Sequence, residues 1–215
     1  MKFTLMFVNL FLPYLMKVYA TVNSKCHYEV WDWNTHQRKM EHKRKIIKLR
    51  SELNTNELGR IKGCTICEED QVEIMINPQT RLKFKICKQY ETQVRIILKE
   101  LAFQKFPIQS IVGYRPGYTR GPFNQSGHRT QLSHHSFGVA IDINSEFNGL
   151  YDHCFKFDHN CVLIKGGEYR PTSAHLGVIT KDSSAYKTFQ KYGWKWGGEM
   201  QGKQKDFMHF SITGE

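Results

Sequence analysis

The sequence has no internal repeat and no low-complexity tract, and after residue 20 it has no apolar run long enough to cross a bilayer. These absences argue against a repeat architecture, against a linker-rich chain and against a membrane-spanning segment after residue 20. What is present is a chain of 215 residues, long enough for one domain with a core of its own and a small appendage.

Acidic side chains are scarce. The 20 Asp and Glu residues stand against 31 Lys and Arg residues, which gives a formal net charge of +11. Such a surplus favours acidic partners, namely nucleic acid, anionic lipid or an anionic wall polymer. Much of the charge lies in residues 38–50, which we predict to be a solvated helix face or an extended arm within a basic N-terminal extension at residues 21–60. For an exported chain, wall polymers and membrane surfaces are nearer than nucleic acid.

The first residues have the layout of a secretory signal. Lys2 gives a short positive start, residues 3–16 are mostly apolar, and residues 18–20 offer a small-residue cleavage site. The alternative, a membrane anchor, needs about 20 apolar residues, and polar residues and a proline interrupt this run. We therefore predict that residues 1–20 are a signal peptide and that the mature protein is periplasmic or secreted.

Six cysteines fit an oxidising compartment, and all of them follow the predicted cleavage site. An even number favours disulfides, although many pairings are possible. Cys154 and Cys161 bracket a short loop and are the best local pair. Cys64-Thr-Ile-Cys67 could be half of a zinc site or a redox motif. Because no second closely spaced pair follows it, a structural disulfide is the preferred interpretation.

From residue 61 onward, the hydrophobic pattern predicts a domain of segregated strands and helices. Alternation of apolar residues indicates strands, and helical spacing indicates helices. The predicted strands are residues 72–76, 82–86, 108–112, 139–143 and 206–212, and the predicted helices are residues 87–104 and 183–192. A turn joins the first two strands into a hairpin, and a long polar loop ends near residue 132. This pattern is typical of the α+β class, with residues 61–215 as the domain.

An aspartate stands inside an apolar strand, where an unpaired carboxylate is costly. In residues 139–143 (VAIDI), the two-residue period of a strand places Asp142 on the face opposite to the branched apolar residues. His135 precedes it by seven residues, and Gly138 permits a sharp bend that could return the imidazole toward Asp142. His209 is the best candidate for a third ligand. Two histidines and one carboxylate with an open fourth position are the pattern of a catalytic zinc site.

Asp206 precedes His209 by three residues. At that distance it could hold an attacking water, take its proton as a general base, and return the proton to the leaving amine. Zinc lowers the pKa of such a water to about 7. Each of these side chains alone has a simpler explanation as a satisfied core or surface residue, so the set carries the prediction.

Three motifs carry a family resemblance. They are Ser133-x-His135-x-x-Gly138-x-Ala140-x-Asp142, Trp196-Gly197-Gly198 and Asp206-x-x-His209-Phe210. Together they resemble peptidase family M15, which contains the D-alanyl-D-alanine carboxypeptidases and dipeptidases and the L-alanyl-D-glutamate endopeptidases of bacterial wall peptides. The resemblance covers residues 111–212 and implies a small α+β fold with a central antiparallel sheet and flanking helices, shared with Hedgehog signalling domains. It also implies that His135, Asp142 and His209 bind Zn²⁺ and that Asp206 is the catalytic base.

The segment Gly113-Tyr114-Arg115 resembles the arginine segment of the family, which implies that Arg115 points its guanidinium at the substrate. A forked, permanently charged donor suits a substrate carboxylate or the oxyanion that develops on the scissile carbonyl. Arg120 and Arg129 are alternatives for this role.

Two further residues have two explanations each. Ser133 would offer its hydroxyl to the substrate, or it would cap the turn into the motif. Trp196 would wall the substrate cleft, or it would pack beside the two glycines that follow it. His134 is expected to have no role, since its neighbour already occupies the ligand position.

The combined prediction is an exported, monomeric zinc metallopeptidase that hydrolyses an amide bond in peptidoglycan stem peptides. The bond stays open between that of an endopeptidase, such as L-Ala-D-Glu, and that of a DD-carboxypeptidase. One alternative is a non-catalytic, zinc-stabilised module that binds the cell wall or signals, and the presence of Asp206 argues against it. Another is a secreted metal-dependent nuclease, which the positive charge would suit. No nuclease arrangement is recognisable, so nucleic acid is not the expected partner.

Overall fold

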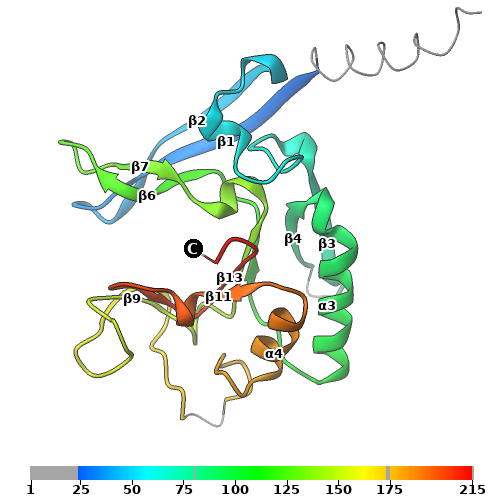
Figure 1. Ribbon diagram of the computed structural model, residues 1–215, viewed down its shortest axis with the longest axis vertical. Helices are drawn as coiled ribbons and strands as arrows, with labels where there is room; N and C mark the ends of the chain where they lie inside the picture. The colour runs from blue at the N-terminus through cyan, green and yellow to red at the C-terminus, as the bar shows by residue number, and fades with distance from the viewer. Residues whose placement is uncertain (1–23, 80, 173–174, 215) are drawn as a thin grey trace, which may run out of the picture.

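The computed structural model describes residues 24–79, 81–172 and 175–214. The signal peptide predicted at residues 1–20 lies outside the described residues. Within them, strands outnumber helices and are gathered into separate sheets (Figure 1), so the predicted α+β class is confirmed. None of the helices in this part of the chain is long and apolar enough to cross a membrane.

The described α-helices are few, and the strands are mostly short. The helices are α2 (Thr55–Leu58), α3 (Glu91–Phe103) and α4 (Ser184–Lys191). The strands are β1 (Lys25–Asn34), β2 (Lys39–Leu49), β3 (Gln71–Asn77), β4 (Leu82–Cys87), β5 (Ile111–Val112), β6 (Gly117–Phe123), β7 (Arg129–Leu132), β8 (Ala140–Ile143), β9 (Leu150–Asp152), β10 (Val162–Lys165), β11 (Lys195–Trp196), β12 (Lys205–Asp206) and β13 (His209–Ser211). They build sheets in the orders β2-β1-β6-β7, β10-β9-β12, β11-β13-β8-β5 and β3-β4.

The sheet β11-β13-β8-β5 lies at the centre of the molecule and is antiparallel throughout. Helices α3 and α4 contribute Val94, Ile97 and Phe189 to a core cluster that also contains Ile141 and Phe210 of the sheet. All five side chains are fully buried, and burial of a large apolar side chain contributes about 1.5–3 kcal/mol. One face of the sheet is therefore committed to the helices, and the other is left for the polar residues of β8 and β13.

The predicted hairpin and both predicted helices are present. β3 pairs with β4 in antiparallel fashion, and α3 follows after a single turn of 3-10 helix at Lys88–Tyr90. The second helix, α4, begins after Ser183, whose hydroxyl accepts a hydrogen bond from the backbone N–H of Tyr186. A side-chain acceptor at this position satisfies an N–H that has no partner inside the helix.

Three element predictions need correction. The long loop expected before residue 132 contains the antiparallel pair β6 and β7, whose residues are largely accessible to solvent on both faces and so do not alternate. The strand expected at residues 108–112 is reduced to β5. The strand expected at residues 206–212 is divided into β12 and β13, because Phe207 and Met208 turn between two different sheets.

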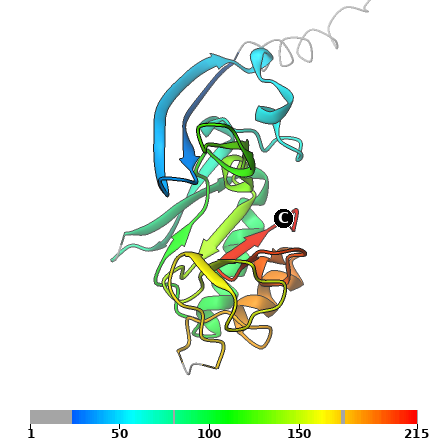
Figure 2. The same cartoon turned by 90° about the vertical axis from the view of Figure 1, so that its left-hand side faces the viewer.

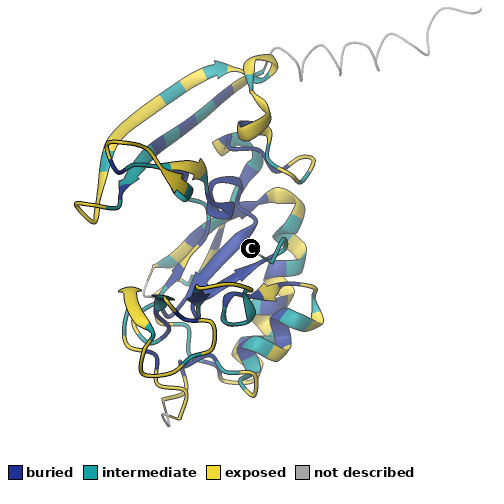
Figure 3. Cartoon of the chain, turned by 60° about the vertical axis from the view of Figure 1, so that its left-hand side comes forward, coloured by how far each residue is buried: buried dark blue, intermediate teal, exposed yellow. Residues whose placement is uncertain are grey.

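The basic N-terminal segment is a β-hairpin and not a helix face. β1 pairs with β2 along its length and with β6 in parallel, which joins the hairpin to the β6–β7 pair (Figure 2). β2 is an edge strand and is largely exposed (Figure 3). Its salt bridges include Lys43–Glu29 at 2.8 Å, Arg44–Asp32 at 3.1 Å and Lys48–Glu57 at 2.7 Å. Neighbouring carboxylates therefore neutralise part of the charge of this strand.

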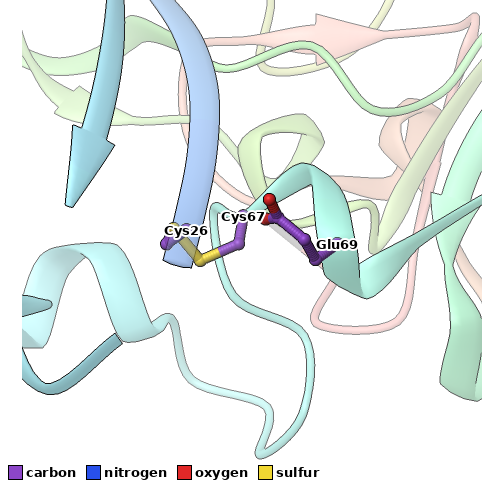
Figure 4. A group of neighbouring side chains, drawn as sticks. All are labelled: Cys26, Cys67 and Glu69. Atoms are coloured by element: carbon purple, nitrogen blue, oxygen red, sulfur yellow. A yellow bond between two sulfur atoms is a disulfide. The ribbon is translucent and has the colours of Figure 1, made fainter. Parts of the chain in front are cut away.

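The chain has three disulfides, one of which fastens the hairpin to the rest of the domain. The bonded pairs are Cys26–Cys67, Cys64–Cys87 and Cys154–Cys161. The predicted local pair is confirmed, and both cysteines of the Cys64-x-x-Cys67 sequence are in structural disulfides, each with a distant partner. Figure 4 shows the bond between Cys26, near the start of β1, and Cys67. A second core surrounds the first two disulfides and includes Val30 of the hairpin and Phe137 of the domain.

We expect the Cys26–Cys67 disulfide to contribute more stability than Cys154–Cys161, because it joins residues 41 apart in the chain and not 7 apart. Replacing both cysteines of a pair by alanine should lower the free energy of unfolding by about 4 kcal/mol for the long loop and about 2.5 kcal/mol for the short one. Equilibrium unfolding in urea measures both losses. A larger loss for the short loop would contradict the role of Cys26–Cys67 as the anchor of the hairpin.

Candidate metal centre

Asp142 and His209 face each other across two neighbouring strands of the central sheet. β13 pairs with β8 so that His209 lies directly opposite Asp142, and the His209 Nδ1 atom is 2.9 Å from Asp142 Oδ1. On the same strands, Ile141 and Phe210 belong to the helical core, so strand alternation sends Asp142 and His209 to the other face. The periodicity of residues 139–143 predicted this placement of Asp142.

His135 joins them from a single turn of 3-10 helix at His134–Phe137. Gly138 ends this turn with a φ of +63°, a left-handed conformation that favours glycine. A Cβ atom there would also collide with atoms of β3 and β4. The chain then enters β8, and the His135 Nε2 atom comes to 3.0 Å from Asp142 Oδ1 and 3.2 Å from His209 Nδ1. The bend expected at Gly138 is present.

The hydrogen-bonding groups of these three residues fit a shared cation. The Nδ1 atom of His135 lies 2.8 Å from the carbonyl oxygen of Gly113. Since a carbonyl oxygen only accepts, Nδ1 carries the proton and Nε2 presents a lone pair. That lone pair faces Oδ1 of Asp142, which is itself an acceptor. The Nδ1 atom of His209 lies close to both acceptors, and its one N–H cannot be donated fully to both of them. The three ligand atoms are buried and lie within 4.8 Å of one another, and two nitrogens with one oxygen suit zinc.

The protonation states agree with this arrangement. Burial and then the charge of Arg115 lower the pKa of His135 to about 4, against the opposite effect of Asp142, so the imidazole is neutral at pH 7. Burial alone would raise the pKa of Asp142, but the hydrogen bond from His209 and the charge of Arg115 hold that pKa well below its usual range. Burial lowers the pKa of His209, but the hydrogen bond to Asp142 and the charges of Asp142 and Asp206 together raise that pKa above its ordinary value. The centre therefore presents an ionised carboxylate beside a neutral imidazole.

Asp206 lies beside this group on β12. Its Oδ1 atom is buried and has no hydrogen-bond partner among the described residues. Burial, followed by the charge of Asp142, raises the pKa of Asp206 to about 6, while His209 and Arg115 act in the opposite direction. Asp206 is not one of the three mutually close ligand residues. An unpartnered carboxylate oxygen of this kind is available to take a proton.

Arg115 is the one of the three candidate arginines that contacts the centre. Its Nη2 atom donates to Asp142 Oδ2 at 3.0 Å, and its side chain is 25% exposed. Arg120 instead contacts the ring of His134, and Arg129 donates to a backbone carbonyl of β6. Arg115 thus holds the oxygen of Asp142 that does not face the histidines, a contact that sequence analysis did not predict.

The remaining residues of the motif take different positions. Ser133 is buried, makes no capping bond to the turn, and has no partner for its hydroxyl among the described residues. Trp196 is 5% exposed and donates from Nε1 to the carbonyl oxygen of Phe207 at 2.8 Å, so packing accounts for its contacts. The ring of His134 contacts Thr213 of the C-terminal segment and not the three ligands.

Lys165 is a cation near the centre that sequence analysis missed. Lys165 on β10 and Asp206 on β12 both lie opposite Leu150 of β9. Residues directly opposite one another in antiparallel strands project to the same face, so the ammonium and the carboxylate share a face of this sheet. Burial and Arg115 lower the pKa of Lys165, and Asp142 acts against them. The side chain of Lys165 is exposed, and the strand register places it on the same face as Asp206.

Comparison with known proteins gives a family match within the second half of the chain. A family model named Peptidase_M15_4 and described as D-alanyl-D-alanine carboxypeptidase matches residues 126–212. No curated protein and no solved structure matches the chain, and the specific Hedgehog-like fold stays a prediction. The matched part includes the three ligand candidates and Asp206, whereas Arg115 and the β1–β2 hairpin lie outside it.

Replacing His135 by alanine should remove the zinc equivalent held by His135, Asp142 and His209, whereas the same change at the neighbouring His134 should not. The two histidines share one turn, but only His135 faces Asp142. Loss of groups that merely support a ligand costs about 10–100-fold in metal affinity, so loss of the ligand should cost more than about 100-fold. Zinc content after dialysis against a weak chelator checks this. Equal retention by the two variants would remove His135 from the centre.

Proposed function

We propose that the protein is a zinc-dependent peptidase of family M15, whose model matches residues 126–212, and that it hydrolyses an amide bond in peptidoglycan stem peptides. The observation that carries the proposal is the convergence of His135, Asp142 and His209 in a buried group whose ligand atoms lie within 4.8 Å of one another. With Asp206 beside them, they supply the ligands and the base that the family resemblance implies.

The three residues would hold the ion through two imidazole nitrogens and one carboxylate oxygen. Three protein ligands leave the fourth position of a tetrahedral site open, which distinguishes catalytic from structural zinc. A zinc ion held there supplies a Lewis acid that polarises a carbonyl group and acidifies water. The carbonyl of Gly113 fixes the tautomer of His135, and Arg115 holds the outer oxygen of Asp142, so both support the ligands.

Asp206 moves the proton in this proposal. Its ionised carboxylate takes a proton from the attacking water as the new C–O bond forms, and it gives that proton to the amine as the C–N bond breaks. Its raised pKa of about 6 brings it nearer to neutral pH than an ordinary aspartate. A module that only binds zinc and cell wall has no use for a carboxylate with a buried oxygen that has no hydrogen-bond partner in the described part of the chain. Asp206 therefore favours catalysis over the non-catalytic alternative.

Arg115, Ser133 and Lys165 are the residues that would meet the substrate. Arg115 uses one donor on Asp142 and has further N–H groups for an oxyanion or a carboxylate. Ser133 has a hydroxyl without a partner among the described residues. Lys165 shares a face with Asp206 and suits a carboxylate of a stem peptide, such as that of D-Glu or of a terminal D-Ala. We assign no role in substrate binding to Trp196, because its contacts are those of a core residue.

The proposed place of action is the periplasm or the exterior of the cell. Disulfides form and persist in oxidising compartments, and three are present here. The exposed strand β2 is the proposed contact for an anionic wall polymer or a membrane surface, through cations such as Lys45 that have no salt bridge within the described chain. We expect the protein to act there as a monomer.

The change Asp206→Asn should lower kcat by about 10²–10⁴-fold while leaving zinc content and fold unchanged, because the amide has a similar shape but cannot take the proton. The control Asp182→Asn, at an exposed carboxylate ahead of α4, should behave as wild type. Each protein is incubated with purified peptidoglycan, and the released peptides are identified by mass spectrometry. Absence of peptide release by zinc-loaded wild type would overturn the proposed function, whereas full activity of Asp206→Asn would exclude that residue as the base.

The change Lys165→Gln should raise KM about tenfold or more for a stem peptide with free carboxylates and leave kcat nearly unchanged, since a hydrogen bond to a charged group contributes about 1.5–3 kcal/mol. For the same peptide with amidated carboxylates, the variant and wild type should have similar KM values. Lys156→Gln, at an exposed lysine of the Cys154–Cys161 loop, is the matched control. An equal effect of Lys165→Gln on both peptides would exclude a contact with the carboxylate.

A further inference from the structure

The turn end of the β1–β2 hairpin lies against the turn that joins β6 and β7. Asn34, the last residue of β1, forms an isolated bridge with His128 of that turn. The opposite end of the same hairpin is fixed to the domain by the Cys26–Cys67 disulfide (Figure 4). The hairpin thus has a covalent attachment at one end and a group of polar side chains at the other.

Glu41 and His42 are neighbours on β2, yet both side chains approach His128. In a regular strand, neighbouring side chains point to opposite faces. Here the pairing of β2 with β1 shifts its register, so that residues 42–43 stand opposite a single residue, and His42 has a φ of +49°. A bulge of this kind redirects a side chain, and a left-handed conformation is uncommon for a residue other than glycine. The local backbone therefore brings the two side chains together.

The distances within this group suit metal ligands. The Oε2 atom of Glu41 is 2.8 Å from His128 Nε2, and the ring centroids of His42 and His128 are 4.7 Å apart. One ligand atom of each residue lies within 4.8 Å of the other two. In addition, Asp32 Oδ2 is 3.0 Å from His42 Nδ1, and a carboxylate on one ring nitrogen commonly orients a histidine whose other nitrogen binds a metal.

Other features of the chain limit what this group can do. Lys39 contacts Glu41 Oε1 at 3.0 Å, Asn34 Nδ2 donates to Glu41 Oε2 at 2.8 Å, and Arg44 contacts Asp32 at 3.1 Å. An incoming ion must therefore compete with Asn34 for Oε2, the oxygen that faces His128. The side chain of His42 is 60% exposed, which gives an ion direct access from solvent and makes it exchangeable.

A similar group of Cys26, Cys67 and Glu69 offers no thiolate, because its two sulfurs are bonded to each other (Figure 4).

We propose that Glu41, His42 and His128 form a second divalent-metal site, which takes zinc or an ion of similar ligand preference and clamps the turn end of the hairpin to the β6–β7 turn. Glu41 and His42 belong to the N-terminal hairpin, and His128 lies within the part matched by the peptidase family model. The ion thus joins the two parts of the chain. This site does not depend on the proposed catalysis.

Zinc titration of the chelator-stripped, disulfide-intact protein tests the proposal, with stoichiometry from calorimetry and Tm as a second measurement. Wild type should bind two equivalents, and the second should raise Tm. His42→Ala and His128→Ala should each bind one. His36→Ala changes a histidine at the same end of the hairpin that packs on Phe123 outside the group, and it should bind two.

The result that overturns the proposal is an equal number of bound equivalents in wild type, His42→Ala and His128→Ala. His42 is largely exposed, so its replacement should leave the fold intact, which circular dichroism of the stripped variant verifies. His209→Ala should bind one equivalent, held at the hairpin. If wild type binds a single equivalent that His209→Ala keeps and His42→Ala loses, the hairpin site stands and the proposed catalytic centre fails.

Discussion

The pairing of β13 with β8 in one register places His209 opposite Asp142, and the rest of the site depends on that register. A shift by one residue would send Asp142 into the helical core and its apolar neighbours toward the site. The register is held from the other face of the sheet, where Ile141 and Phe210 are fully buried and Phe210 stacks on Phe189 of α4. The packing that stabilises the fold therefore also positions two of the three ligand atoms.

A buried carboxylate in an apolar strand is costly unless other groups compensate its charge. His135 and His209 approach one oxygen of Asp142, and Arg115 approaches the other. Because His135 is neutral at pH 7 and turns a lone pair toward Asp142, the compensation is incomplete on the side where the three ligand atoms meet. A divalent ion would complete it. The same charge on Asp142 contributes to the raised pKa of Asp206, so the metal ligand and the proposed base are electrostatically linked.

The local features of the site could be predicted from the sequence, and most of its long-range features could not. Alternation in residues 139–143 predicted the face of Asp142, and Gly138 predicted the bend after His135. By contrast, the pairing of β1 with β6 connects distant segments, and so does the alignment of Lys165 on β10 and Asp206 on β12 opposite Leu150 of β9. No local pattern in the sequence specifies which strands pair. β6 and β7 were predicted as a loop because exposed strands lack apolar alternation. The α+β class was predictable because helical and strand periods occupy separate segments.

Anomalous diffraction from crystals grown with zinc is the most direct measurement of the convergence on which the proposed enzyme rests. The predicted result is a peak at the zinc absorption edge about 2.0–2.2 Å from His135 Nε2, Asp142 Oδ1 and His209 Nδ1, with one side of the ion open to solvent. A zinc-saturated crystal without a peak at this position, or with a peak bound by fewer than two of the three residues, would contradict it.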